Sequence, residues 1–352
     1  MISYDISLLN YNSFGINQKA KQFFSFEDQT ALQNFIYDHP ELTSSGIVLG
    51  GGSNILLTEP LESLVIHPEN EAVSIIEESE SDAVLCIGAG VNWDDLVKFS
   101  LERNLYGLEN LSMIPGNCGA APIQNIGAYG VELREVFEKL EAADLTDGSI
   151  TQFSHADCEF GYRDSIFKRE AKGRYCIIRI YLRLHKTPKL SLEYGSIRRT
   201  LEDMNVTEPT PADVSRAVRY IRGSKLPDPQ KTGNAGSFFK NPIISNSFYN
   251  SLKEKWPDLP NYPVSETSIK VPAGWLIDHA GWKGYRHKNA GVHDRQALVL
   301  VNLGDKTGKD VRELAAMIRD YIFHKYGIEL EPEVNIWNRH GQHIGLPSLP
   351  HS

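Results

Sequence analysis

The stretch that most limits how this chain can fold runs from residue 112 to residue 131 and reads SMIPGNCGAAPIQNIGAYGV. It is almost free of charge and rich in glycine, alanine, proline and amide side chains. Small residues allow a flat ligand to lie against the backbone, and the amides of Gln124 and Asn125 can hydrogen-bond to the edge of a heteroaromatic ring. We therefore expect this stretch to line a buried cofactor; a buried packing loop is the alternative.

Bulk composition narrows the class of protein. The chain has 352 residues, 41% of them hydrophobic, which is ample for a buried core and for two or three domains. Its net charge of −9 and the lack of a basic block argue against nucleic-acid binding, which needs a basic face. The N-terminus shows no signal peptide, and no apolar stretch is long enough to cross a bilayer. We expect a soluble cytoplasmic protein with neither a membrane nor a nucleic-acid partner.

The cysteines and histidines do not form a recognisable metal or disulfide pattern. Cys86, Cys118, Cys158 and Cys176 are widely spaced, with no C-x-x-C motif and no nearby histidine pair. The histidines form neither H-x-x-x-H nor H-E-x-x-H. We expect no metal site, and we interpret Cys86 and Cys176, which lie in apolar runs, as core thiols.

Hydrophobic periodicity predicts alternating strands and helices. The expected elements are strands at 47–49, 83–87 and 178–184 and helices at 93–103 and 311–322. The strand at 178–184 alternates apolar and polar residues, which is typical of a half-buried strand. Asn92 is a plausible N-cap for the first helix, and Gly327 is the expected stop of the second.

Irregular segments separate these elements. A polar, proline-rich stretch at 204–212 indicates a linker, and a second irregular stretch covers 224–236. The tail that begins at His340 is expected to be loosely ordered.

The run Gly50-Gly51-Gly52-Ser53-Asn54 follows a predicted strand. Three successive glycines expose backbone N–H groups, and the two polar side chains add donors, so the run suits a pyrophosphate. It is neither a P-loop nor a G-x-G-x-x-G fingerprint. A plain tight turn is the alternative, but a turn rarely needs three glycines.

The run GNAGSFFKNP, residues 233–242, is the strongest sign of a reaction site. Gly233 and Gly236 allow a close approach of the backbone to a ligand, and Ser237 follows directly. Its hydroxyl could act as a nucleophile, donate a proton or bind an anion. The nucleophile role is disfavoured because a nucleophile elbow needs Gly-x-Ser-x-Gly. A glycine turn that leads into a strand is the alternative without function.

Four further segments hold polar groups that could take part in the chemistry of a site. Arg163, in FGYRDS, could clamp a carboxylate, or it could form a surface pair with Asp164. Glu331 and Glu333 would share one face of a strand, where one buried carboxyl group could act as an acid; a solvated strand edge is the alternative. Tyr194-Gly195 could be a mobile lid or a turn. Arg222, Lys225 and the turn LPDP precede the glycine-serine run, and the lysine could meet a phosphate.

Taken together and in this order, these segments resemble the UDP-N-acetylenolpyruvoylglucosamine reductase family, flavoenzymes of peptidoglycan precursor synthesis. The segments that carry the resemblance are 12–16, 50–54, 114–116, 122–130, 161–165, 194–195, 225–229, 233–242, 273–278, 297–302 and 331–334. They span nearly the whole chain, and the tyrosine at 194 makes it look like the type I branch.

The resemblance implies an α+β fold with a two-part FAD-binding domain of the vanillyl-alcohol-oxidase (PCMH) type and a C-terminal α+β substrate-binding domain. The implied first FAD subdomain covers 1–68, and the second covers 69–222 and 331–352. The implied substrate domain covers 223–330. A monomer is expected.

The resemblance also implies cofactors and site residues. Non-covalent FAD would be reduced by NADPH and would then reduce the enolpyruvyl ether of UDP-N-acetylglucosamine. By the family pattern, Arg163 and Glu333 stabilise an enolate-like state and Ser237 gives the proton. Residues implied to contact FAD are Gly50, Gly51, Gly52, Ser53, Asn54, Ile114, Pro115, Gly116, Ala120, Ile123, Gly127, Arg222 and Leu226. Tyr194, Lys225 and Asn241 are implied to contact the UDP part.

The chain departs from the family pattern at two places. Asn335 stands where the family commonly has a basic residue, and the stretch 284–293 lacks the usual glycine-alanine run. Two rivals stay open at this point: another FAD enzyme of the same fold, with Cys118 as a covalent flavin link, or a non-catalytic sugar-nucleotide sensor. A serine hydrolase is the weakest alternative.

Overall fold

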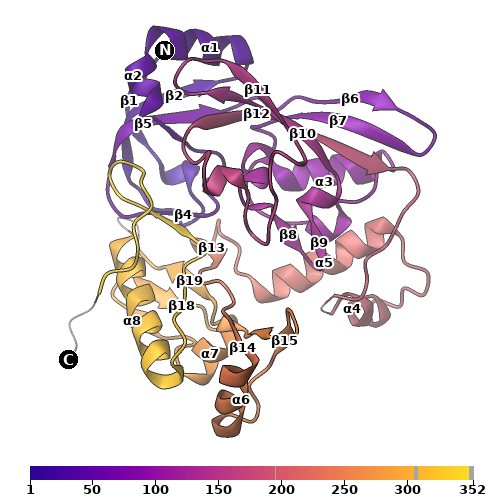
Figure 1. The fold of residues 1–352 in the computed structure, drawn as a ribbon, viewed down its shortest axis with the longest axis vertical. Coiled ribbons are helices and arrows are strands. Elements are labelled where there is room, and N and C mark those ends of the chain that lie inside the picture. Colours follow the sequence, from indigo (N-terminus) through magenta and orange to yellow (C-terminus); the bar gives the residue numbers. More distant parts are fainter. Residues whose placement is uncertain (195, 305–307, 349–352) are drawn as a thin grey trace. The chain divides into compact units, whose positions relative to one another are not determined.

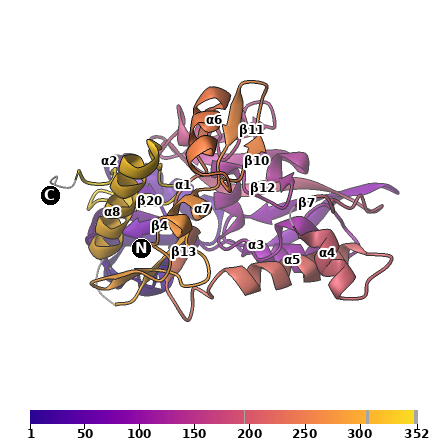
Figure 2. The same ribbon diagram turned by 90° about the horizontal axis from the view of Figure 1, so that it is seen from below.

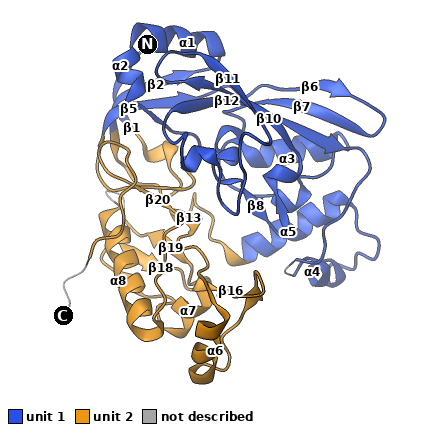
Figure 3. Cartoon of the chain, viewed as in Figure 1, with its two compact units in different colours: residues 1–6, 20–52, 62–224 blue, residues 7–19, 53–61, 225–352 orange. Residues whose placement is uncertain are grey.

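The computed structural model describes residues 1–194, 196–304 and 308–348. The chain divides into two compact units (Figure 3). Unit 1 consists of residues 1–6, 20–52 and 62–224, and unit 2 consists of residues 7–19, 53–61 and 225–352. Each unit therefore combines segments that are far apart in the sequence.

Unit 1 is built on two sheets. The first has the order β1 (Ser3–Ser7), β2 (Lys19–Phe26), β5 (Leu61–Pro68), β3 (Ile47–Val48), and the short β3 runs parallel to β5. The second is antiparallel, with the order β11 (Ile150–Ser154), β10 (Phe137–Asp144), β12 (Tyr175–His185), β7 (Asp82–Gly88), β6 (Val73–Glu78). Figure 1 shows β10, β12 and β7 side by side.

The remaining elements of unit 1 are short. The helices are α1 (Gln29–Asp38), α2 (Pro40–Ser44), α3 (Trp93–Glu102), α4 (Ile197–Asp203) and α5 (Pro211–Lys225), which ends at the boundary with unit 2. Strands β8 (Gly127–Ala128) and β9 (Val131–Glu132) form a small hairpin. Short 3-10 helices lie at Glu109–Leu111, Cys118–Gln124, Leu133–Glu135 and Ile166–Lys168.

The two sheets of unit 1 share an aromatic core. Phe24 of β2 stacks on Phe35 of α1, with ring centroids 3.7 Å apart and an interplanar angle of 6°. Leu64 of β5 and Ile178 of β12 belong to the same buried cluster. The buried faces of both sheets and of α1 thus close over one another, as a layered α+β unit requires.

Strand β12 lies in the middle of its sheet, and the prediction of a half-buried strand is confirmed at all its predicted positions except Tyr181. Ile178 packs into the core beneath α1, whereas Ile180 and Leu182 pack into a second cluster with α3. Tyr181, which was expected on an exposed face, is 6% exposed. Packing thus covers Tyr181 on the polar face, while Arg179 and Arg183 on that face stay partly exposed.

The prediction of the first helix is confirmed. Asn92 caps α3, because its side-chain oxygen accepts from the backbone N–H groups of Asp94 and Asp95. Trp93, Leu96 and Val97 are buried on one face of the helix. The linker prediction also agrees, since α4 ends at Asp203 and α5 begins at Pro211.

Unit 2 contains three small sheets. The first has the order β13 (Asn234–Ser237), β19 (Val299–Asn302), β18 (Ala290–Val292), β17 (Arg286–His287) and is antiparallel. The second has the order β14 (Ile243–Ser245), β16 (Ser268–Lys270), β15 (Tyr262–Pro263). In the third, β4 (Ile55–Leu57) pairs in parallel with β20 (Asn335–Trp337).

The helices of unit 2 are α6 (Asn246–Lys255), α7 (Ala273–His279) and α8 (Lys309–Tyr326), and a 3-10 turn covers Leu9–Tyr11. Helix α8 packs on β18 and β19, and Gly327 ends it in the left-handed conformation at φ +70°, as predicted.

Two expectations for the C-terminal region were wrong. Residues 331–334 are not a strand: Pro332 forms one isolated bridge with Phe239, and β20 begins only at Asn335. The described part of the tail, residues 340–348, is held rather than loose, since Arg312 donates to the carbonyl of Gly345 and Arg319 to those of Leu346 and Pro347. The last four residues of that predicted tail lie outside the described residues.

No helix in the described part of the chain is long and apolar enough to cross a membrane.

The stacked pair of Phe24 and Phe35 should dominate the stability of unit 1. We expect Phe35→Ala to lower the free energy of unfolding by about 3–5 kcal/mol, because a 7% exposed ring leaves a cavity. Tyr37→Ala, on the same helix but 83% exposed, should change it by no more than about 0.5 kcal/mol. Urea unfolding followed by circular dichroism measures both, and equal losses would contradict the shared core.

Candidate active site

The predicted site residues fall into two groups, one in each unit. In unit 1, Gly50 and Gly51 lie against residues 112–131, which are almost free of charge and are called the charge-poor stretch below. A Cβ at Gly51 would be 2.7 Å from Asn117 Oδ1 and 3.0 Å from Gly116 Cα, so no side chain fits there. A Cβ at Gly50 would be 3.7 Å from that of Ala120. Two stretches that the sequence separates by more than sixty residues thus meet backbone to backbone.

The glycine run continues with Gly52 in the left-handed conformation at φ +58° and then passes into unit 2. There the side-chain amide of Asn54 donates to the carbonyl of Glu333 at 3.2 Å. Ser53 is partly buried. The run therefore contributes its glycines to one unit and its polar side chains to the other.

Three residues implied to contact FAD, Ile114, Pro115 and Gly116, follow the 3-10 turn at Glu109–Leu111. Ile114 and Ile123 are partly buried and pack against the core cluster around α3, while Pro115 is exposed. The carbonyl of Ile123 accepts from the buried hydroxyl of Ser165 at 2.7 Å. Fixed hydrogen bonds from elsewhere in unit 1 thus hold the backbone of this stretch.

Asn125 does not have the ligand-facing role predicted for it. It is fully buried in the left-handed conformation, and its amide donates to Glu132 Oε2 and to the carbonyl of Gly161, both at 3.0 Å. Its oxygen accepts from the N–H of Arg134 at 3.1 Å. The side chain is occupied by the protein itself, so it serves the fold of the loop.

The side chain of Arg163 also contacts the charge-poor stretch. Its Nη2 donates to the carbonyl of Gly127 at 2.6 Å, and its backbone is left-handed at φ +57°. Its sequence neighbour Asp164, the partner in the alternative of a surface pair, is bound by Arg169. A non-glycine residue held in this strained conformation is the kind of outlier that accompanies functional sites.

Arg222, near the end of α5, adds a second cation. Within the described part of the chain, its Nε atom is buried without a hydrogen-bond partner. Burial lowers the pKa of this guanidinium, Tyr129 opposes the shift, and the nearby charge of Arg163 adds to it. The positive charges of Arg163 and Arg222 repel each other, so this region of unit 1 is suited to binding an anion.

Tyr194 lies over the end of the charge-poor stretch. Its Cβ is 3.1 Å from where a Cβ on Gly130 would be, and the residue is 56% exposed. Asn110, which sequence reasoning missed, ties the two segments by donating to the carbonyls of Tyr129 and Ser191 at 3.0 and 2.9 Å. Gly195, the second residue of the predicted lid, lies outside the described residues.

In unit 2, Ser237 ends β13 opposite Val299 of β19, after a break in register that follows Asn234. Gly236 lies at φ +70° and donates its N–H to Asn234 Oδ1 at 2.9 Å. Asn234 is buried, and its amide donates to the carbonyls of Pro227 and Thr232. The glycine-serine run is thus a bulge in a strand, and the hydrogen bonds of Asn234 hold it in place. Asn234 lies inside the run, but no role for it was predicted from the sequence.

Glu333 reaches the same strand end. Its backbone N–H donates to the carbonyl of Phe238, the residue after Ser237, at 2.8 Å. Glu331, by contrast, is exposed and bonded to Lys240 at 2.5 Å. Of the two predicted carboxyl groups, Glu333 is therefore the one that is partly buried near the serine.

The remaining predicted residues of unit 2 are more dispersed. Asn241 Oδ1 accepts from the N–H of Ala273, at the start of α7, at 2.9 Å. Lys225 is exposed and Leu226 is partly buried. In the described residues, no group of three or more histidine, cysteine or acidic side chains is placed to hold a metal ion.

Comparisons with known proteins identify the same two parts. Residues 22–154 match the family model of a FAD binding domain. Residues 228–337 match the model of the C-terminal domain of UDP-N-acetylenolpyruvoylglucosamine reductase. The prediction of an α+β chain with a FAD-binding domain and a C-terminal domain is thereby confirmed.

Full-length relatives extend this result. The chain is 46% identical over 331 residues to UDP-N-acetylenolpyruvoylglucosamine reductase of Pseudomonas aeruginosa, covering 94% of this chain and 97% of the relative. It is 44% identical over 336 residues to the enzyme of the same name from Flavobacterium johnsoniae, covering 95% and 99%. The structure of UDP-N-acetylenolpyruvylglucosamine reductase from Thermus caldophilus has the same fold, with a TM-score of 0.67, 23% identity and coverage of 96% and 100%. The chain belongs to the UDP-N-acetylenolpyruvoylglucosamine reductase family.

Proposed function

We propose that this protein reduces the enolpyruvyl ether of UDP-N-acetylglucosamine to UDP-N-acetylmuramate, with bound FAD and with NADPH as reductant. This reaction belongs to peptidoglycan precursor synthesis. The carrying observation is that Gly50–Gly51 and the stretch at 116–120 meet backbone to backbone inside a unit that matches a FAD-binding family. We further propose that the protein works in the cytoplasm as a monomer.

The residues of unit 1 fit a flavin dinucleotide. The absence of a side chain at Gly51 lets two glycine-bearing stretches approach each other, and their backbone N–H groups suit a pyrophosphate. The buried Nε of Arg222 has no hydrogen-bond acceptor among the described residues, so an anionic group of the cofactor could accept from it. When bound, FAD supplies the hydride chemistry that links NADPH to the substrate. The protein supplies binding, orientation and protons.

Arg163 is proposed to stabilise negative charge on the substrate. Reduction of the enolpyruvyl double bond builds charge on the carbon beside the carboxylate, and a guanidinium already fixed on Gly127 can meet that charge without reorganising. The mutual repulsion of Arg163 and Arg222 would be relieved by an anion bound near them.

Ser237 is proposed to donate the proton, and Glu333 to assist. A neutral serine is a weak acid, so its position matters more than its acidity. The bulge at Gly236 and the bond from Glu333 N–H to Phe238 both set that position. Glu333, which is partly buried, is proposed to stabilise the enolate through a hydrogen bond from its carboxyl group. Tyr194, Lys225 and Asn241 are proposed to contact the UDP part.

Replacing the proposed proton donor should separate the two half-reactions. We expect Ser237→Ala to leave bleaching of the flavin by NADPH intact but to slow its reoxidation by substrate by about 10²- to 10⁴-fold. Stopped-flow absorbance of each half-reaction measures this, and the exposed Ser251→Ala is the matched control. Reoxidation near the wild-type rate would exclude proton donation by Ser237.

The proposed charge-stabilising role of Arg163 depends on its forked donors. We expect Arg163→Lys to lower kcat/KM for the enolpyruvyl substrate by about 10²- to 10³-fold, because a lysine cannot hold Gly127 O and a carboxylate with one planar group. Arg169→Lys, in the same loop but bound to Asp164 and Glu159 at the surface, should have little effect. Equal effects of the two changes would point to loop stability instead of catalysis.

The rival with covalently bound flavin finds no support at Cys118. Its side chain is fully buried, and burial raises the pKa of the thiol, so a thiolate is disfavoured. We expect denaturation of the yellow protein to release all flavin into the filtrate, as measured by absorbance. Flavin retained on the denatured chain would favour the rival, whereas a chain that binds flavin but does not couple NADPH oxidation to the enolpyruvyl substrate would favour a sensor.

A further inference from the structure

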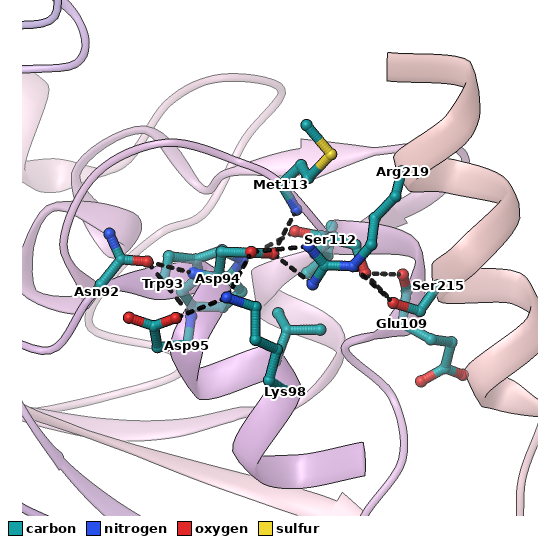
Figure 4. A network of polar contacts seen from close by, with 12 residues as sticks. Asn92, Trp93, Asp94, Asp95, Lys98, Glu109, Ser112, Met113, Ser215 and Arg219 are labelled. Atoms are coloured by element: carbon teal, nitrogen blue, oxygen red, sulfur yellow. Dashed lines mark hydrogen bonds and ion pairs between the residues drawn. The ribbon is translucent and has the colours of Figure 1, made fainter. Parts of the chain in front are cut away.

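A polar network in unit 1 joins two helices to the loop that precedes Ile114 (Figure 4). Asp94, in the first turn of α3, and Arg219, in α5, form a two-pronged ion pair. Nη1 of Arg219 lies 2.8 Å from Asp94 Oδ2, and Nη2 lies 2.7 Å from Asp94 Oδ1. Figures 1 and 2 both show the two helices as neighbours. Neither residue belongs to the proposed catalytic or ligand-binding set.

The same carboxylate holds the backbone of Met113. The N–H of Met113 donates to Asp94 Oδ1 at 2.7 Å, and Met113 lies in the left-handed region at φ +57°. Its side chain is 38% exposed, so burial of the side chain does little to keep this conformation in place. A methionine avoids this backbone conformation unless other contacts impose it, and the bond to Asp94 is such a contact.

A second chain of hydrogen bonds reaches the residue before Met113. Arg219 Nε lies 3.4 Å from Ser215 Oγ, which is 2.7 Å from Ser112 Oγ. Ser112 donates to the carbonyl of Glu109 at 2.7 Å, so Ser215 must donate to Ser112. Both serines are buried. Arg219 is thus linked to two consecutive residues of the loop, to Ser112 through Ser215 and to Met113 through Asp94.

The ends of the loop are held by the neighbour of Asp94. The backbone N–H of Trp93 donates to the carbonyl of Gly116 at 2.9 Å, and its indole N–H donates to the carbonyl of Leu111 at 3.0 Å. Trp93 is 1% exposed and so is itself fixed in the core. With both ends held by Trp93, the conformation at Met113 decides how Ile114 and Pro115 are presented.

Charge supports an ionised Asp94. Burial by itself raises the pKa of this carboxyl group, but the bonds from Arg219 and Met113 N–H outweigh burial and lower it overall. Arg219 and Arg222 are three residues apart on α5, so they lie on the same side of the helix. Asp94 is also one of the charges that counter the effect of burial on Arg222.

We propose that Asp94 and Arg219 are positioning residues for FAD: the pair imposes the left-handed conformation at Met113 and so presets the loop Ile114–Gly116, and it anchors α5 so that Arg222 is presented from the same helix. This inference rests on the proposed function, in which Ile114–Gly116 and Arg222 contact the cofactor. The pair acts before any ligand binds, because it preorganises the loop and lowers the cost of binding.

The test uses the apoprotein and FAD itself. Titration of FAD, followed by quenching of flavin fluorescence, gives the dissociation constant. We expect Asp94→Asn and Arg219→Gln to raise it by about tenfold or more, since each removes a charged hydrogen bond from the loop's support. Asp95→Asn, next to Asp94 and paired with exposed Lys98, and Arg216→Gln, paired with Asp213 on α5, are matched controls and should stay within about twofold of wild type.

A rescue distinguishes positioning from general stability. Glycine adopts positive φ at no steric cost, so Met113→Gly in an Asp94→Ala background should recover part of the lost FAD affinity. The milder Arg219→Lys, which keeps the charge and loses the fork, should give an intermediate dissociation constant if Arg219→Gln does not fold.

Thermal unfolding of each apoprotein is recorded in parallel. Lower melting temperatures with unchanged FAD affinity, or lost affinity that glycine at 113 does not recover, would overturn the inference. A wild-type apoprotein that binds no FAD would overturn the proposed function and this inference with it. Tight binding by wild type and variants alike would overturn only the inference.

Discussion

The segment from Leu111 to Gly130 depends on hydrogen bonds supplied from elsewhere in unit 1. It has little regular structure, and its buried carbonyls need partners as every buried backbone group does. Trp93 bonds Gly116, Ser165 bonds Ile123, and Arg163 bonds Gly127. The donors come from α3 and from the loop at 163–165, so the conformation of the segment follows from the packing of the whole unit.

This dependence explains why structural and proposed functional roles coincide in unit 1. Arg163 satisfies the carbonyl of Gly127 and brings a cation to the same place. Asn125, which the sequence suggested as a ligand contact, instead makes its side-chain hydrogen bonds to other residues of the protein. Against a net charge of −9 for the chain, Arg163 and Arg222 stand close enough to affect each other, which concentrates positive charge where an anionic cofactor and substrate are proposed to bind.

In unit 2, backbone hydrogen bonds between two segments outside the named strands play a comparable part. Phe238 and Lys240 exchange backbone bonds with Glu333 and Glu331, residues that lie almost a hundred positions later in the chain. Asn54 is bonded both to the carbonyl of Glu333 and, through its own carbonyl, to Asn335. Asn335, which departs from the usual basic residue of the family, thereby has a structural use in this chain.

The sequence by itself determined what local chemistry decides. The cap at Asn92, the stop at Gly327, the linker near 204 and the motifs that identify the family were all predictable, because each depends on neighbouring residues or on an ordered set of motifs. Only the tertiary structure decided which partners the polar groups take: Gly127 for Arg163, the protein rather than a ligand for Asn125, and Met113 and Arg219 for Asp94. These choices join segments far apart in the chain, and no local propensity encodes them, because a hydrogen bond is selected by where packing brings its donor and acceptor.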